Sequence, residues 1–169
     1  SSDVCSSDLE IIDSFYIEPF YPLRNGAAVA SFGDHRFYTY NGDDVSQSWH
    51  MGLDLASTAM ASIDTQNAAF VAYNDLNGIY GENIILYHGF GLYTLYGHCN
   101  GTSVKPGEHI GAKHIIGKTG TSGLALGDHL HFGVLVQGVE VRPEEWMDRK
   151  WMKDNIHDIL NSAKKAIKG

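Results

Sequence analysis

The chain has 169 residues, a formal net charge of −8 and a sequence pI near 5.5. This acidic balance argues against a nucleic-acid or anionic-membrane partner, and no apolar run reaches the 18 residues that suggest a membrane span. The 43% hydrophobic and 19% charged content is ordinary for a globular protein, and the length allows one domain with a real core.

Residues 1–9 read as sequence foreign to the protein. The run from Asp3 to Leu9, Asp-Val-Cys-Ser-Ser-Asp-Leu, resembles the translation of a common sequencing-library adapter, and we hypothesise that it is not native. Without it the net charge becomes −6, and Cys99 has no intrachain disulfide partner. An upstream part, such as a regulatory domain, would then be missing, so the lack of a signal peptide says nothing about compartment.

The next segments are predicted to be extended and then β. Residues 10–26 are aromatic and irregular with two prolines, which is typical of an extended lead-in segment or the end of a linker. Short β-prone runs follow at 27–31 and 36–40. Gly33-Asp34 lies between them and predicts a hairpin that joins these two strands.

Further strands are predicted at the end of the run 50–56 and at 68–73, 83–88 and 92–96, separated by glycine-rich turns. Nineteen glycines and no long helical period before residue 143 predict an all-β core. Residues 144–169 differ, because apolar residues recur there at helical spacing, acids follow Pro143 and lysines gather at the far end. They predict a C-terminal amphipathic helix that packs against the domain or a partner.

The most informative stretch is Gly127-Asp-His-Leu-His-Phe-Gly133. In a strand, residues two apart share a face, so His129 and His131 would project together while Leu130 and Phe132 enter a core. Two adjacent imidazoles suit a metal site, in which one ring ligates and its neighbour handles protons. A solvent-facing pair without a role is the alternative that this motif alone leaves open.

Two other motifs carry candidate ligands. His50 and Asp54 lie four apart around Gly52, and in a flat strand they would be about 13 Å apart, too far for one zinc ion. A bend at Gly52 that leads into a strand would bring them together. His98 follows Tyr96-Gly97 at a predicted strand end, and taken alone it reads better as a structural histidine.

Together these motifs, in this order, resemble the LytM/lysostaphin-like zinc metallopeptidases, which hydrolyse peptide crosslinks of bacterial peptidoglycan. The similarity spans roughly residues 31–143. It also includes Phe32-Gly33 with Arg36, Val104-Lys-Pro-Gly107 and Ile116-Gly-Lys-Thr-Gly-Thr-Ser-Gly123. The resemblance implies a mainly β fold with an antiparallel, open barrel-sandwich-like sheet, a metallopeptidase domain over residues 27–143, and the C-terminal helix beyond it.

Carried over residue by residue, the resemblance makes His50, Asp54 and His131 the ligands of one Zn²⁺ per chain. It makes His98 and His129 the two catalytic histidines that do not bind the metal. It implies peptidoglycan stem and crosslink peptides as substrate, and hence an extracytoplasmic location in the periplasm or cell envelope. The tyrosine that assists some relatives ahead of the first ligand has no counterpart, because Asp44 stands there.

This ligand set predicts the chemistry of the site. Two neutral imidazoles and one carboxylate leave bound zinc with a formal charge of about +1, which lowers the pKa of a fourth-position water toward 7. No glutamate is placed as base, so His98 and His129 are the proton handlers. Two alternatives stay open: an inactive LytM-like module that binds cell wall or activates another hydrolase, and a carbohydrate-binding or storage domain with structural zinc.

The remaining histidines are left outside the site. His88 is predicted to be a packing or turn residue at a strand end, and His109 and His114 to be solvated in loops; His35 and His157 have no assigned role. Cys99 would face away from His98 on a strand and is predicted to be a small buried hydrophobe rather than a thiolate ligand.

Overall fold

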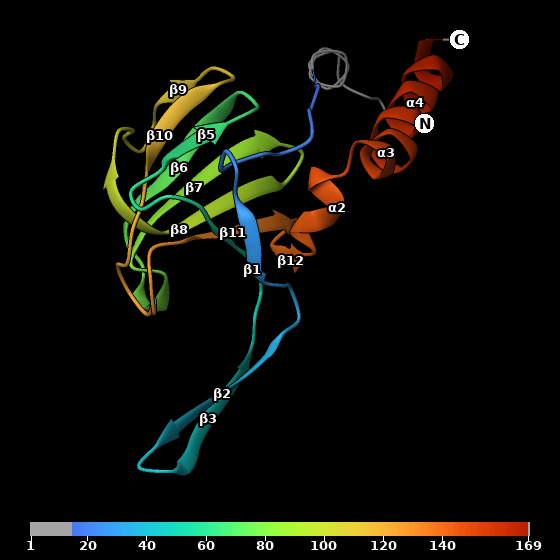
Figure 1. Cartoon of the computed structure of the whole chain (residues 1–169). Helices are drawn as coiled ribbons and strands as arrows, with labels where there is room; N and C mark the ends of the chain where they lie inside the picture. Colours follow the sequence, from blue (N-terminus) through green and yellow to red (C-terminus); the bar gives the residue numbers. More distant parts are fainter. Residues whose placement is uncertain (1–14, 169) are drawn as a thin grey trace.

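The computed structural model describes residues 15–168. The hypothesis about residues 1–9 therefore lies outside the described part of the chain. A β-rich body carries a projecting two-stranded hairpin at one end and a helical C-terminal segment at its side (Figure 1). No helix among the described residues is long and apolar enough to cross a membrane.

The described residues form twelve strands, and the longest is β8. In chain order they are β1 (Ala27–Ala30), β2 (His35–Tyr40), β3 (Asp43–Trp49), β4 (Leu53–Ala56), β5 (Ser62–Thr65), β6 (Ala69–Leu76), β7 (Glu82–Gly89), β8 (Leu92–Thr102), β9 (His109–Ile110), β10 (His114–Thr119), β11 (Leu130–Val136) and β12 (Val139–Val141). A single 3₁₀ turn, η1 (Gly78–Tyr80), joins β6 to β7.

Ten of these strands make one sheet in the order β1-β4-β11-β8-β7-β6-β9, with β12 paired to β11 and β10 bridging β8 and β5. Every pairing is antiparallel. The expected mainly β, antiparallel fold is therefore confirmed. Strand β8 is central, because it contacts β7, β11 and β10.

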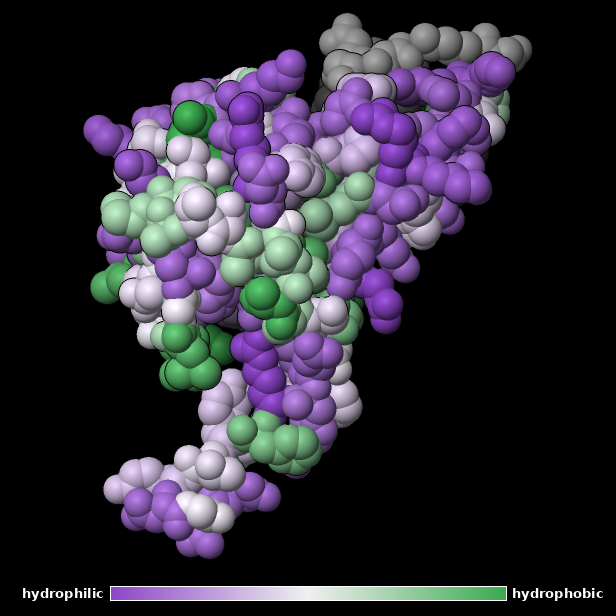
Figure 2. Space-filling view, viewed as in Figure 1, coloured by the Kyte–Doolittle hydropathy of each residue, from purple (hydrophilic) through white to green (hydrophobic). Residues whose placement is uncertain are grey.

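The predicted hairpin around Gly33-Asp34 is wrong. β1 pairs with β4, and β2 pairs instead with β3 across Asn41-Gly42. Both turn residues have positive φ, which suits a tight two-residue connection. Asp34 turns the chain away from β1, since its carboxylate accepts a hydrogen bond from Ser31 N at 2.7 Å. The β2–β3 hairpin is thus a separate two-stranded ribbon, and Figure 2 shows it reaching beyond the body as a narrow arm.

The core fills with the side chains that alternation predicts. Leu130, Phe132 and Val134 of β11 are fully buried, as are Ile84 and Leu86 of β7. Each such side chain contributes about 1.5–3 kcal/mol through removal from water. The inward residues of β11 therefore hold the strand in a register that leaves His131 on the opposite face.

The predicted C-terminal helix is present but interrupted. It comprises α2 (Pro143–Met147), α3 (Arg149–Met152), the π-helical turn η2 (Lys153–His157) and α4 (Asp158–Lys168). Asp148 is extended and caps α3, accepting a hydrogen bond from Trp151 N at 2.6 Å. Trp146 and Met152 are buried against the body, so only the first part of the segment joins the core.

Candidate metal centre

Three of the predicted site residues, His50, Asp54 and His131, converge in a cluster that we call the metal cluster. Oδ1 of Asp54 lies 2.9 Å from Nε2 of His50 and 2.9 Å from Nδ1 of His131, and the two nitrogens are 3.1 Å apart. These residues form a group that could hold a metal ion, and all three are buried. Tetrahedral zinc with ligand bonds near 2 Å separates its ligand atoms by about 3.3 Å, so a small expansion admits the ion.

The sheet register places two of the three. Asp54 on β4 lies directly opposite His131 on β11, and opposed residues of antiparallel strands share a face. His50 reaches the same point because the chain bends at Met51-Gly52 before β4 begins at Leu53. Gly52 is required there, because an added Cβ would lie 2.6 Å from the His131 ring and 2.7 Å from Phe132 O.

Hydrogen bonding fixes the tautomer of His50. Its Nδ1 donates to Ser31 O at 2.8 Å, so in the neutral ring Nε2 carries a lone pair. That lone pair faces the carboxylate oxygen of Asp54 at 2.9 Å, an arrangement that repels unless a cation or a proton lies between them. Two imidazole nitrogens and one carboxylate oxygen are ligands that suit zinc, and the donor set therefore fits the ion.

The charges of the metal cluster reinforce this conclusion. Burial alone would raise the pKa of Asp54, but the close contacts of its carboxylate with the His131 and His50 rings outweigh burial and hold that pKa well below its usual range. Burial lowers the pKa of His131 despite its contact with Asp54. At neutral pH the cluster thus presents one anion and an imidazole that resists protonation, the form in which both residues bind metals.

The other two predicted residues, His98 and His129, lie beside the metal cluster. Their ring centroids are 4.7 Å apart, and Nε2 of His129 is 3.7 Å from Oδ2 of Asp54. Each ring donates its Nδ1 proton to a backbone carbonyl, His98 to Ser122 at 2.7 Å and His129 to Gly127 at 2.8 Å. In the neutral rings both Nε2 atoms therefore carry lone pairs that can accept a proton. Burial lowers the pKa of His98, which favours this neutral form.

The structure corrects one detail around His98. The strand does not end at Gly97, since β8 continues to Thr102. Instead His98 has a φ of 61° within the strand, a left-handed conformation that is uncommon for a residue with a side chain and often marks a functional site. The pairing of β8 with β7 is irregular at this point, and the distortion turns His98 toward the metal cluster.

The loop 120–129 is anchored on both sides of the site. Asp128, for which the sequence analysis predicts no role, accepts hydrogen bonds from Thr119 Oγ1 at 2.6 Å and Met60 N at 3.0 Å. Near its other end the backbones of Gly81 and Gly123 touch so closely that neither position has room for a Cβ. The carbonyls that orient His98 and His129 thus belong to a segment that is itself held in place.

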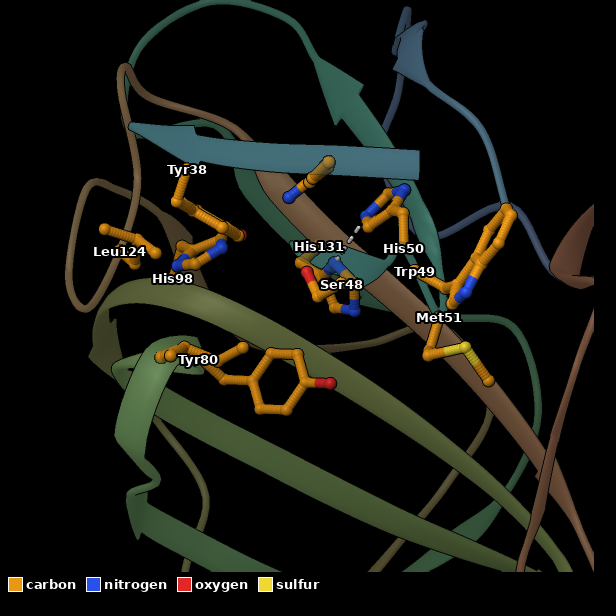
Figure 3. Close-up of a pocket in the computed structure, with 11 residues that line it drawn as sticks. Tyr38, Ser48, Trp49, His50, Met51, Tyr80, His98, Leu124 and His131 are labelled. Carbon is orange, nitrogen blue, oxygen red and sulfur yellow. Dashed lines mark hydrogen bonds between the residues drawn. The ribbon is translucent and has the colours of Figure 1, made fainter. Parts of the chain in front are cut away.

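A cleft runs past these residues under the β2–β3 hairpin (Figure 3). On one side of the metal cluster it is lined by aromatic and apolar side chains, among them Tyr38, Trp49, Met51 and Tyr80. Next to Asp54 and His129 it widens to a cavity of ≈ 490 Å³ whose walls include Phe37 and Leu126. Figure 3 shows His50 and His131 turned toward each other, with His98 beside Tyr38 and Leu124.

Sequence reasoning missed the groove residues. Arg36 had been noted only as part of a motif, yet it contacts Asp54. Tyr38 and Tyr80 border the site, whereas Asp44 is exposed on β3. The one available signal was alternation, which puts Arg36 and Tyr38 on one face of β2.

Outside the site, the histidines and Cys99 behave largely as expected. His88 is buried and hydrogen-bonded, and Cys99 is a buried thiol whose Sγ contacts Tyr96 O at 3.4 Å. His109 and His114 are exposed, but they lie at the starts of the short strands β9 and β10 rather than in loops. His35 stacks on Trp49, and His157 donates to Ile17 O.

Comparison with known proteins places this site in a family context. The sequence model described as peptidase family M23 matches residues 48–143, which contain all five predicted site residues. The DD-carboxypeptidase/endopeptidase Mpg of Neisseria meningitidis serogroup B is 27% identical over 108 residues, covering 63% of this chain and 25% of that protein. Stage II sporulation protein Q of Bacillus subtilis is 28% identical over 150 residues, covering 86% of this chain and 49% of that protein.

A solved structure shares the fold. The crystal structure of a zinc-containing peptidase from Vibrio cholerae matches with a TM-score of 0.64 and 25% sequence identity. The match covers 76% of this chain and 38% of that one. The chain thus spans about a quarter of the Neisseria relative and less than half of the other two proteins.

Proposed function

This chain belongs to peptidase family M23, and on that premise we propose that it is a zinc-dependent endopeptidase that cleaves peptide crosslinks of bacterial peptidoglycan. The observation that carries the proposal is the convergence of three metal-binding atoms within 2.9–3.1 Å of one another, beside two histidines whose Nε2 atoms are free to accept a proton. The catalytic unit is residues 27–143, and its substrate implies an extracytoplasmic location.

In this proposal His50, Asp54 and His131 hold one Zn²⁺ through Nε2, Oδ1 and Nδ1. When bound, the metal supplies Lewis acidity, which polarises a peptide carbonyl and makes water more acidic. The three residues leave one position of a tetrahedral ion open. A structural zinc would have a fourth protein ligand, and the described residues offer no fourth member to the cluster.

His98 and His129 move protons in the reaction. Each has its Nδ1 proton committed to a carbonyl, so Nε2 is the atom that accepts a proton from water and later returns one to the leaving amine. Protonated, either ring also stabilises the negative charge that develops on the carbonyl oxygen. The backbone carbonyls of Ser122 and Gly127 keep both rings in a fixed orientation.

The cleft provides the binding surface for an extended peptide. It has two parts beside the metal cluster, and Arg36, Tyr38 and Leu124 line both of them. Substrate residues on either side of the cut bond would therefore each meet aromatic and apolar side chains. An extended peptide that contains small residues is compatible with such walls.

The test is digestion of purified peptidoglycan by the full chain, followed by mass analysis of the released fragments. We expect new free amino termini, no new reducing sugar ends, and loss of the products in the presence of a chelator with recovery on added zinc. Products that do not depend on the metal, or new sugar ends, would overturn the proposal.

A second candidate is an inactive module of the same fold that binds cell wall or activates another hydrolase. It is favoured by the similarity to stage II sporulation protein Q, a name that states no hydrolase activity. The two candidates differ in one measurement: the module would sediment with peptidoglycan but release no fragments. The presence of both proton-accepting histidines beside the metal cluster leads us to favour the enzyme.

A further inference from the structure

The carboxylate of Asp54 is divided between two sets of partners. Oδ1 faces the two histidines of the metal cluster, whereas Oδ2 accepts a hydrogen bond from Nη2 of Arg36 at 2.6 Å. Arg36 belongs to β2 in the projecting hairpin, so this contact joins the hairpin to the base of the cleft. A short, charge-assisted bond of this kind is among the strongest that a side chain makes.

The setting strengthens the contact further. The side chain of Asp54 is only 6% exposed and that of Arg36 is 36% exposed, so water competes weakly for the carboxylate. The side chain of Arg36 has no other hydrogen-bond partner among the described residues, and its guanidinium is therefore committed to this one oxygen. Because Arg36 holds Oδ2, the carboxylate of Asp54 is fixed in its rotation about the Cβ–Cγ bond.

That rotation matters because a carboxylate can bind zinc through one oxygen or through two. If Oδ2 also bound the ion, it would occupy a position beside His129 that the proposed reaction keeps for water. Oδ2 is close enough to this space to lie 3.7 Å from Nε2 of His129. Something must keep Oδ2 away, and Arg36 is the described residue that bonds to it.

We propose that Arg36 is a positioning residue that keeps Asp54 bound to the metal through Oδ1 alone and so preserves the open position for the reaction. The inference rests on the proposed zinc site, and it adds a role for the hairpin. The hairpin is then part of the metal centre as well as a wall of the cleft, although none of its own residues binds the ion.

The chain offers a matched control. Arg24 pairs with Asp64 at 3.2 Å, with Arg24 84% exposed and no member of the metal cluster nearby. Arg24→Met therefore removes the same kind of pair from the surface. Arg36→Met removes the hydrogen bond and the charge at the site, whereas Arg36→Lys keeps the charge and one donor.

The experiment loads the wild-type chain and the three variants with Co²⁺, whose visible absorption weakens as the coordination number rises above four. It also measures the Zn²⁺ dissociation constant by competition with a chromophoric chelator. We expect Arg36→Met to lose visible intensity and to bind zinc about 10- to 100-fold more weakly, as is typical when the partner of a ligand is removed. Arg36→Lys should recover part of both, and Arg24→Met should match the wild type.

Unfolding of the metal-free proteins separates this role from a purely structural one. If Arg36 only anchors the hairpin, Arg36→Met will lose stability without metal while its cobalt spectrum and zinc affinity stay those of the wild type, and the inference is overturned. A wild-type chain that takes up no stoichiometric Co²⁺ or Zn²⁺ would overturn the proposed function as well. Normal metal uptake with unchanged spectra in Arg36→Met would overturn only the role of Arg36.

Discussion

Two buried clusters containing histidine lie along the same central strand, and only one of them has the features of a site. The first is the metal cluster, with His98 of β8 beside it. The second, which we call the core network, comprises Thr65, His88, Thr94 and Tyr96, with Thr94 and Tyr96 also on β8. Both are shielded from water, so burial does not distinguish them.

The two clusters differ in whether each lone pair faces a hydrogen-bond donor. In the core network, His88 Nδ1 donates to Ala68 O at 3.1 Å, Nε2 accepts from Thr94 Oγ1 at 2.7 Å, and the hydroxyl of Tyr96 lies 3.0 Å from Thr94 Oγ1. Both ring nitrogens are satisfied, and nothing remains for a ligand. In the metal cluster the Nε2 lone pair of neutral His50 faces the carboxylate oxygen of Asp54, a mismatch that a bound cation relieves.

The largest contrast should come from removing one histidine from each cluster. His131→Ala deletes a proposed ligand, so hydrolysis should drop to background. Zinc affinity should fall by more than 100-fold, because removing only the hydrogen-bond partner of a ligand already costs about 10- to 100-fold. His88→Ala should keep zinc and lose about 1–3 kcal/mol of stability, because it leaves buried polar groups unpaired. Metal analysis and peptidoglycan digestion of both variants check this. A His131→Ala protein that still binds zinc would show that the metal cluster does not differ from the core network in binding metal through its histidines.

The next contrast lies inside the site, between residues that bind metal and residues that move protons. His98→Gln and His129→Gln should each retain one zinc per chain while kcat falls by about 10²- to 10⁴-fold, the usual contribution of a general acid or base. Metal content and single-substrate kinetics are measured on the same preparations. Loss of zinc from either variant would mean that the histidine is a ligand and that the proposed division of roles is incorrect.

The core network should show itself in the pH dependence of stability. Burial lowers the pKa of His88 to about 4 from its ordinary value of 6.5. Between these values the unfolded chain binds the proton and the folded chain does not, so stability falls as pH is lowered through this window, by up to about 3 kcal/mol. Denaturant unfolding at several pH values, with chelator throughout, should give His88→Gln a shallower slope than the wild type. Identical slopes would show that His88 is not held neutral.

The smallest expected effect comes from a substitution that tests how closely Gly52 packs against the metal cluster. In Gly52→Ala the new methyl group would collide with the His131 ring, and we expect zinc affinity to fall by about tenfold as the ring shifts. Gly111→Ala is the control, because its Cβ would meet nothing within 4 Å and its φ is not positive. Zinc competition titrations on both variants make the comparison. Equal affinities would indicate that the ring moves without cost.

Much of the fold followed from local patterns. Alternation in the segment around His129 and His131 predicted one polar and one buried face, and the structure buries Leu130 and Phe132 completely while His131 faces Asp54. The strands β6 and β7 were also anticipated within a few residues, whereas the predicted strand 92–96 starts with β8 but ends well before Thr102. The strand that pairs with β2 was not predicted correctly. Gly33-Asp34 and Asn41-Gly42 both have turn sequences, and local sequence does not indicate which of the two turns joins paired strands.

The site shows the same division. All five predicted residues meet in one place, although their assignment to zinc and to proton transfer remains a prediction. The groove side chains Tyr38, Tyr80 and Leu126 were not foreseen, since their contribution depends on how the hairpin, η1 and the loop 120–129 approach each other. The left-handed backbone of His98 also has no local sequence signal, because nothing but tertiary contacts sustains it.

The sequence by itself determined which atoms were available: imidazoles and a carboxylate in an order that matches one family, on short strands whose faces follow from a period of two. The tertiary structure alone decided which oxygen of Asp54 faces His50 and His131 and which oxygen Arg36 holds. It also decided which nitrogen of His98 is left free. Residue type and spacing set the chemistry and the face of each side chain, whereas ring and carboxylate orientations are set by hydrogen bonds between segments that are distant in the chain.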